Sequence, residues 1–156
     1  MTRICLPLLV LCLGSCGGSA PDLGFLGCNA GTHAVQVQLG SVPPGAGAET
    51  RTSSPCGSVI TVLQGLPEDQ TAAILVHELW HAAGHQGIHN GEGCYTAPTV
   101  FLRLPEAPCP VELAQMQSVG GSFEITVLSP SLLLATETAV AFWNEHIGRE
   151  MFRLPQ

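Results

Sequence analysis

The sequence predicts a small α+β fold, in which a mixed sheet packs against a central helix and a C-terminal helix. Three observations carry this prediction. The chain has 156 residues, which is enough for one domain with a single core. Short segments of alternating or β-branched apolar residues predict strands, and two longer segments carry apolar residues at helical spacing.

The first half of the chain carries two predicted strands followed by a helix. Residues 34–39 alternate apolar and polar side chains, which predicts a half-buried strand, whereas residues 40–55 are rich in Gly, Pro, Ser and Thr and predict a loop. Residues 58–63 are rich in β-branched side chains and predict a more buried strand. A helix with one apolar stripe is expected from Pro67 to Gly84, because acidic residues follow the proline and glycine favours a helix end.

The second half is less regular at first and then resumes the same alternation. Residues 85–120 predict an ordered loop region, with a short strand at 99–104 and a helical turn at 111–117. A further strand is expected at residues 123–128, and a second helix at residues 130–149, where apolar side chains again recur at helical spacing.

The N-terminal residues predict a targeting signal rather than part of the folded domain. Arg3 precedes a run of about ten apolar residues, which is too short to cross a bilayer core of ~30 Å as a helix and is typical of a signal peptide. The following Leu-Gly-Ser-Cys16 resembles a bacterial lipobox, which implies cleavage before Cys16 and attachment of lipid to it. An ordinary signal peptide that contains Cys16 is the alternative.

These features divide the chain into three parts. We expect a lipoprotein signal peptide at residues 1–15, a lipid-anchored tether at residues 16–27 and the folded domain at residues 28–156. The protein is then exported and held to a bacterial membrane through the lipid on Cys16, at the outer membrane or the cell surface.

The seven cysteines can be assigned to these three parts of the chain. Two leave with the signal peptide and Cys16 carries the lipid, so four remain, an even number that predicts two disulfides in an exported protein. Of the possible pairings we favour Cys28–Cys56 and Cys94–Cys109, which are nearest in sequence. A thiolate metal site lacks C-x-x-C spacing.

The net charge of the chain limits the classes of molecule that it can bind. The formal net charge is −7 and the chain has no lysine, which argues against binding a nucleic-acid backbone. Only 11% of the residues are charged, whereas 46% are hydrophobic, so a wholly disordered chain is also excluded. We expect a monomer.

The predicted central helix carries the sequence His77-Glu78-Leu79-Trp80-His81. Four residues turn a helix by about 400°, so the two imidazoles project from one face and can reach one metal ion. Glu78 lies close enough to take a proton from a water molecule on that metal. This chemistry is the reason for the H-E-x-x-H pattern in zinc metallopeptidases.

The longer run from His77 to His89 resembles the signature of the metzincin clan of zinc metallopeptidases, H-E-x-x-H-x-x-G-x-x-H. His77, Glu78, His81 and Gly84 match this signature. The resemblance implies that Zn²⁺ is bound by His77, His81 and a third histidine beyond the glycine, with Glu78 as the general base.

The third ligand is where this chain departs from the clan. The signature places a histidine at the position of Gly87. We favour His89 as the third metal ligand, since a turn longer by two residues would bring it to the zinc. His85 and Glu92 stay open as alternatives. A gluzincin-like site would use Glu137 instead, although an exposed carboxylate is the favoured interpretation of that residue.

Two further points concern the fold that the resemblance implies. Met116 is a candidate for the methionine turn of metzincins, but a core methionine is the favoured interpretation. Residues 123–152 look like the first strand and helix of small metzincin-type domains, which precede the catalytic helix there and follow it here. We therefore expect a zincin-like fold, with a circular permutation and an ordinary C-terminal helix as equal alternatives.

The sequence thus predicts a zinc-dependent endopeptidase that hydrolyses peptide or protein substrates, with Glu78 acting on a metal-activated water. The substrate is expected to add to an exposed strand edge, at residues 34–39. One alternative is a non-catalytic zinc-binding surface lipoprotein with the same ligands, which the glycine at position 87 favours. Another is an interaction module that is stabilised by disulfides and binds no metal.

Overall fold

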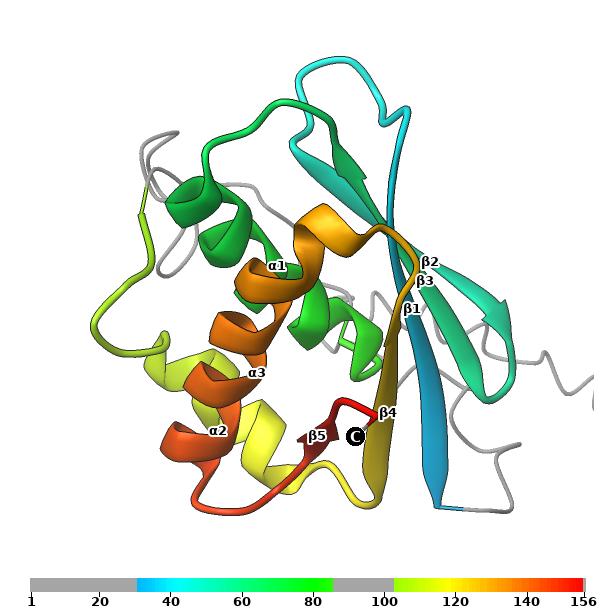
Figure 1. Cartoon of the computed structure of the whole chain (residues 1–156). Coiled ribbons are helices and arrows are strands. Elements are labelled where there is room, and N and C mark those ends of the chain that lie inside the picture. Colours follow the sequence, from blue (N-terminus) through cyan, green and yellow to red (C-terminus); the bar gives the residue numbers. More distant parts are fainter. Residues whose placement is uncertain (1–30, 86–102, 156) are drawn as a thin grey trace, which may run out of the picture.

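The fold is α+β with a mixed sheet, as the sequence predicts, and it has five strands and three helices (Figure 1). The computed structural model describes residues 31–85 and 103–155. All three helices cover the same face of the sheet. The elements are β1 (Thr32–Gly40), β2 (Ala48–Ser54), β3 (Gly57–Leu63), α1 (Glu68–Ala82), α2 (Pro110–Ser118), β4 (Ser122–Val127), a short 3₁₀ turn η2 (Pro130–Leu132), α3 (Leu133–Ile147) and β5 (Phe152–Arg153).

The sheet has the strand order β2-β3-β1-β4-β5. Its central strand β1 pairs in parallel with β3 on one side and with β4 on the other, so that Val35 lies between Ser58 and Ile125. The edge strand β5 is parallel to β4, whereas the other edge strand, β2, is antiparallel to β3. The sheet is therefore mixed, with a single antiparallel strand at one edge.

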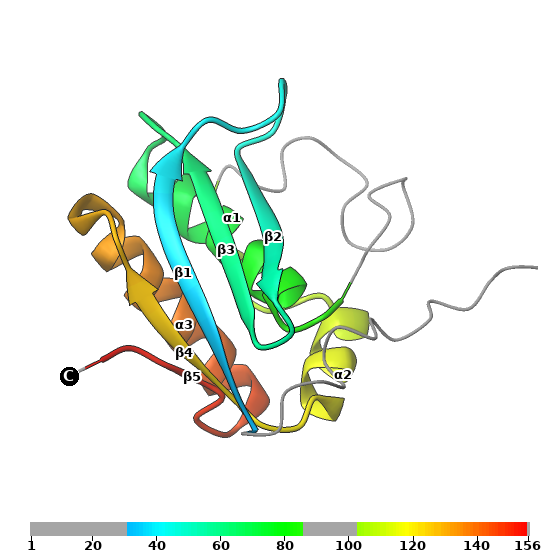
Figure 2. The same ribbon diagram turned by 90° about the vertical axis from the view of Figure 1, so that its right-hand side faces the viewer.

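One face of the sheet forms the core and the other faces outward (Figure 2). On β1, Val35 and Val37 are fully buried, whereas Ala34 and Gln36 are exposed. Successive side chains of a strand point to opposite faces, so the alternation seen in the sequence places one set against the helices. The prediction of a half-buried strand at residues 34–39 is confirmed.

The expected role of residues 34–39 as an exposed strand edge is wrong. β1 is hydrogen-bonded to a neighbour on each side, and the edges of the sheet are β2 and β5. Alternation reports which face of a strand is buried and carries no information about which strand lies at an edge.

The prediction of a loop over residues 40–55 is also wrong in its second half, because β2 occupies Ala48–Ser54. None of its seven residues is buried, and its sequence AETRTSS has no apolar alternation. It is held by backbone pairing to β3, with Thr50 opposite Ile60, rather than by burial of its own side chains. A polar edge strand of this kind has no hydrophobic period to detect.

The helical predictions are confirmed for α1, α2 and α3. α1 ends at Ala82, and the following Gly84 has a φ of 90°, a conformation that glycine adopts without strain. Met116, on α2, is fully buried in the core, as expected for a core methionine. Of the predicted strand at 99–104, residues 99–102 lie outside the described residues, and residues 103 and 104 are not in a strand.

α1 and α3 pack against each other beneath the sheet. The fully buried Trp143 of α3 donates a hydrogen bond from Nε1 to the backbone oxygen of Val76 at 2.7 Å. At the end of α3, Asn144 accepts hydrogen bonds from the N–H groups of Met151 and Phe152, which holds β5 in place. α3 thus fixes the backbone of α1 one residue before His77.

Candidate metal centre

The site is built on the last two turns of α1. The helix begins after Pro67, with Glu68 and Asp69 in its first turn, where negative charge favours a helix start. His77 and His81 lie one turn apart, and the centroids of their rings are 4.5 Å apart. The spacing therefore places both rings on one face of the helix, as the sequence predicts.

His77, Glu78 and His81 form a group that could hold a metal ion. Each offers one ligand atom, and these atoms lie within 4.8 Å of one another. His77 is 5% exposed and Glu78 is 7% exposed, while His81 is half-buried. Two imidazoles and a carboxylate this close together are a donor set that suits a transition metal such as zinc.

The ring of His81 is oriented by the chain that follows α1. Its Nδ1 lies 2.8 Å from the backbone oxygen of His85. Because a carbonyl oxygen only accepts, Nδ1 must carry the proton in this contact, which leaves Nε2 of His81 as the nitrogen able to bind a metal.

The ring of His77 faces a carboxylate from another helix. Its Nδ1 lies 3.7 Å from Oε1 of Glu112 on α2, and both side chains are 6% exposed. Trp80 lies beside this pair and joins the same two helices, since its Nε1 donates to Oε1 of Gln115 at 2.9 Å. Its ring also stacks on those of His77 and His85.

Glu78 is held by the edge strand β2. The hydroxyl of Thr50 lies 2.5 Å from Oε2 of Glu78 and 3.2 Å from the backbone oxygen of the same residue. Burial raises the pKa of Glu78 above its usual value, and the hydrogen bond from Thr50 and the proximity of His77 offset part of that rise.

The structure adds Thr50 and Glu112 to the residues that the sequence singled out. Thr50 lies in the segment predicted as a loop, and Glu112 in a short helical turn with no feature that marks it as buried. Both side chains contact residues of α1 that lie at least 28 positions away in the sequence. Only the strand β2 and the packing of α2 bring them to the site, so local sequence pattern could not have found them.

The structure describes two of the four candidates for the third metal ligand. His89 and Glu92 lie outside the described residues. His85 is half-buried and its ring stacks on Trp80, and burial lowers its pKa. Glu137 is exposed on α3. Within residues 31–85 and 103–155, the metal-binding group contains neither His85 nor Glu137.

Cysteine chemistry agrees with the predicted disulfides as far as the described residues extend. Cys56 and Cys109 are both disulfide-bonded. Their favoured partners, Cys28 and Cys94, lie outside the described residues.

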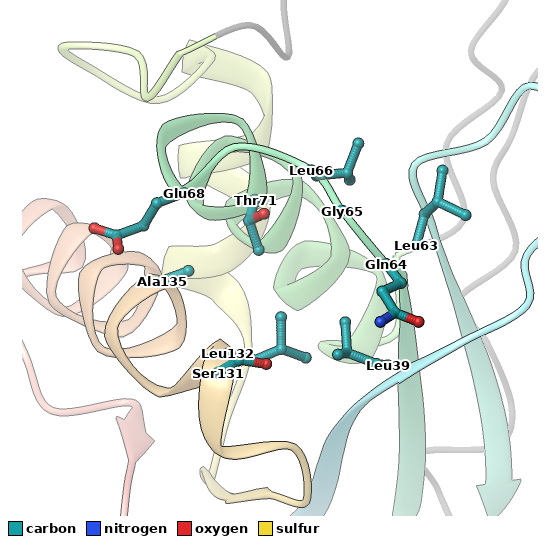
Figure 3. Close-up of a pocket in the computed structure, with 10 residues that line it drawn as sticks. All are labelled: Leu39, Leu63, Gln64, Gly65, Leu66, Glu68, Thr71, Ser131, Leu132 and Ala135. Atoms are coloured by element: carbon teal, nitrogen blue, oxygen red, sulfur yellow. The ribbon is translucent and has the colours of Figure 1, made fainter.

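A separate cavity of about 310 Å³ lies at the other end of α1 (Figure 3). Its walls come from the first turn of α1, with Glu68 and Thr71, from the ends of β1 and β3, from Leu132 of η2 and from Ala135 of α3. None of the residues of the metal-binding group lines it. The cavity and the candidate metal centre are thus distinct features at opposite ends of one helix.

No protein-family model, curated protein or solved structure matches this chain. Within the part of the chain that is described, no helix is long and apolar enough to cross a membrane. The assignment of the site therefore depends on its own geometry and on the motif in α1.

Proposed function

We propose that this protein is a zinc-dependent endopeptidase, in which His77, His81 and His89 bind Zn²⁺ and Glu78 is the general base. The observation that carries the proposal is the group of three ligand atoms of α1 that lie within 4.8 Å of one another. A buried carboxylate directly beside two histidines one turn apart is costly for a purely structural helix, and metal-assisted hydrolysis gives it a use.

The chemistry divides between the metal and the chain. When bound, Zn²⁺ would polarise the scissile carbonyl and lower the pKa of a water molecule. Glu78 would accept the proton of the attacking water and later deliver it to the leaving amine. The raised pKa of Glu78 brings its carboxylate closer to the pH range in which it can both accept and release a proton.

The edge strand β2 is the favoured docking strand for a peptide substrate, in place of residues 34–39. β2 pairs with β3 on one side only, and no other strand within the described residues pairs with it. An extended peptide can add to such an edge through main-chain hydrogen bonds. Because Thr50 of β2 touches Glu78, a peptide along this strand would run beside the general base.

The zincin-like and permuted character of the fold belongs to the same proposal. β4 and α3 follow the H-E-x-x-H helix in sequence, and β4 lies next to the central strand β1. Thr32 of β1 and Phe152 of β5 flank neighbouring residues of β4, so they lie about two strand spacings, or roughly 10 Å, apart. A short link from the C-terminal segment to β1 is therefore sterically reasonable, as a permutation requires.

Export and lipid attachment at Cys16 complete the proposal. The disulfide-bonded state of Cys56 and Cys109 suits an oxidising compartment. The lipid would place the catalytic domain at a bacterial membrane surface, where exported peptides or proteins are its substrates.

Metal analysis and peptide cleavage test the proposal directly. The full mature chain should carry zinc after dialysis against a zinc buffer, and should cleave members of a peptide library. Glu78→Gln should keep the zinc and lower the cleavage rate by about 10²–10⁴-fold, because it removes proton transfer while keeping the side-chain volume. Glu145→Gln, on the exposed face of α3, is the matched control and should cleave normally.

A non-catalytic zinc-binding lipoprotein is the second candidate, because Gly87 stands where the metzincin signature has a ligand. It predicts zinc binding that depends on His77 and His81 but no cleavage by any variant. Cleavage by the wild type that is retained in Glu78→Gln would contradict the proposed mechanism.

A further inference from the structure

We propose that Glu112 on α2 is a positioning residue for the metal centre, which holds His77 with Nδ1 toward the protein and Nε2 toward the ion. The inference rests on the proposed zinc site. It starts from one contact, in which Oε1 of Glu112 lies 3.7 Å from Nδ1 of His77 and both side chains are almost fully buried.

The burial of Glu112 requires an explanation, because an ionised carboxylate is stable away from water only beside a compensating group. Glu78 and Glu112 are the two buried acidic residues in the described part of the chain. Glu78 belongs to the metal-binding group, and Glu112 reaches the first residue of that group from a different helix. Both buried carboxylates are thus directed at one site.

Nδ1 of each histidine faces an oxygen atom of the protein, at different distances. Nδ1 of His81 lies 2.8 Å from the backbone oxygen of His85, which is a hydrogen-bond distance, whereas Nδ1 of His77 lies 3.7 Å from Oε1 of Glu112, which is an ion-pair distance. A metal-binding histidine usually donates its other ring N–H to a carbonyl or carboxylate, which fixes the tautomer and the ring orientation. In the zinc-bound protein the carbonyl of His85, which follows α1, would serve His81 in this way, and the carboxylate of Glu112 would serve His77.

The position of Glu112 is fixed by its helix. One turn further along α2, Met116 is fully buried in the core, and Gln115 accepts a hydrogen bond from Trp80. Gln115 therefore contacts α1 from the same face of α2 as Glu112, but it touches Trp80 rather than a metal ligand. This neighbour provides a matched control for the docking of α2.

Zinc affinity, measured on the mature chain by competition with a chelating dye, tests the inference without any assay of activity. Glu112→Ala should raise the Kd for zinc by about 10–100-fold, the range typical of lost partners of metal ligands. Glu112→Gln should have a smaller effect, because its amide oxygen can still accept from Nδ1. Gln115→Ala should leave the Kd unchanged. Equal losses in Glu112→Ala and Gln115→Ala, or no loss in Glu112→Ala, would overturn the inference.

Nitrogen-15 NMR of the zinc-loaded protein gives a second readout that a merely structural role would not alter. His77 should show a protonated Nδ1 and a metal-bound Nε2 in the wild type and in Glu112→Gln, which also serves if the alanine variant does not fold. Zinc bound to Nδ1 of His77 would overturn this inference and leave the proposed function standing. A wild type that binds no zinc would overturn the proposed function and the inference with it.

Discussion

α1 and α3 have 15 residues each and pack side by side beneath the same sheet, yet they are buried to very different extents. α3 buries six residues, mostly along one face, and leaves Glu137 and Glu145 exposed. α1 buries 11 of its residues, including His77 and Glu78. α1 is packed against β2 and β3 of the sheet and against α3, and side chains of α2 reach it at His77 and Trp80.

This difference explains why polar side chains in α1 need partners from elsewhere in the chain. A polar group on the open side of α3 is solvated, whereas one in the second half of α1 has little access to water. Glu78 is accordingly bonded to Thr50, and His77 faces Glu112. Buried polar groups are costly unless they are paired, so a helix that retains them is a strong candidate for a functional one.

The largest expected effect is on zinc binding, and it distinguishes the histidines of α1 from the histidine of α3. His81 of α1 and His146 of α3 both direct Nδ1 at a backbone oxygen four residues away. Among the described residues, only His81 of these two belongs to a group that could hold a metal ion. His77→Ala and His81→Ala should each weaken zinc binding by more than the roughly 100-fold upper range for outer partners.

His146→Ala is the control and should bind zinc as the wild type does. Equilibrium dialysis followed by metal analysis gives both values. Zinc retained by His77→Ala at wild-type affinity would place the ion elsewhere in the chain.

The second prediction concerns the contact that joins the two helices. Trp143 is fully buried and its Nε1 bonds to the backbone oxygen of Val76. Trp143→Ala should lower the free energy of unfolding of the metal-free protein by about 3–5 kcal/mol, through lost burial and a cavity. Leu134→Ala, at a position of α3 that is 54% exposed, should change it by no more than about 0.5 kcal/mol. Urea unfolding at pH 7 measures both, and equal effects would contradict the described packing.

The sequence predicts much of this fold because its strongest elements are local. β1 and β3 follow from short apolar patterns, and α1 from its acidic start, its apolar spacing and the glycine after its end. The positions of His77 and His81 on one helix face follow from the helical repeat alone.

What the sequence does not predict depends on contacts between distant segments. The apolar stripe of α1 underestimates its burial, because small residues such as Ala72 and Ala73 and the polar His77 fill its other faces. β2 is held by pairing with β3 rather than by its own burial, so it has no hydrophobic pattern. Thr50 and Glu112 reach α1 only through these long-range contacts, and nothing in their local sequence distinguishes them.

A third prediction sharpens the role of β2. Thr50→Val keeps the side-chain shape but removes the hydroxyl bonded to the buried Glu78 carboxylate, so it should lower the free energy of unfolding of the metal-free protein by about 1–3 kcal/mol. Thr50→Ser retains the hydroxyl and should recover most of the loss. Thr52→Val, at an exposed position of the same strand, is the matched control. Equal stability of the two valine variants in urea unfolding would show that the Thr50 contact contributes nothing.

The smallest effect tests whether polar burial outside α1 has the same cost. His33 on β1 is 4% exposed, its Nε2 lies 3.0 Å from the hydroxyl of Ser58, and burial lowers its pKa below 6.5. Below pH 6.5 the unfolded chain binds a proton at this residue and the folded chain does not, until the pH reaches the lowered value. Stability should therefore fall as the pH decreases through this window, by at most about 1.4 kcal/mol per pH unit.

The sign of this dependence distinguishes His33 from Glu78. Burial raises the pKa of Glu78, so the folded state binds the extra proton there and stability falls as the pH rises above about 4.5. The two contributions oppose each other in the wild type, and only a comparison with His33→Gln isolates the histidine. In urea unfolding of the metal-free protein from pH 7 to pH 5, His33→Gln should lose less stability than the wild type. Parallel pH profiles would mean that His33 is protonated as easily in the folded chain as in the unfolded one, and that its burial does not penalise the charged imidazole.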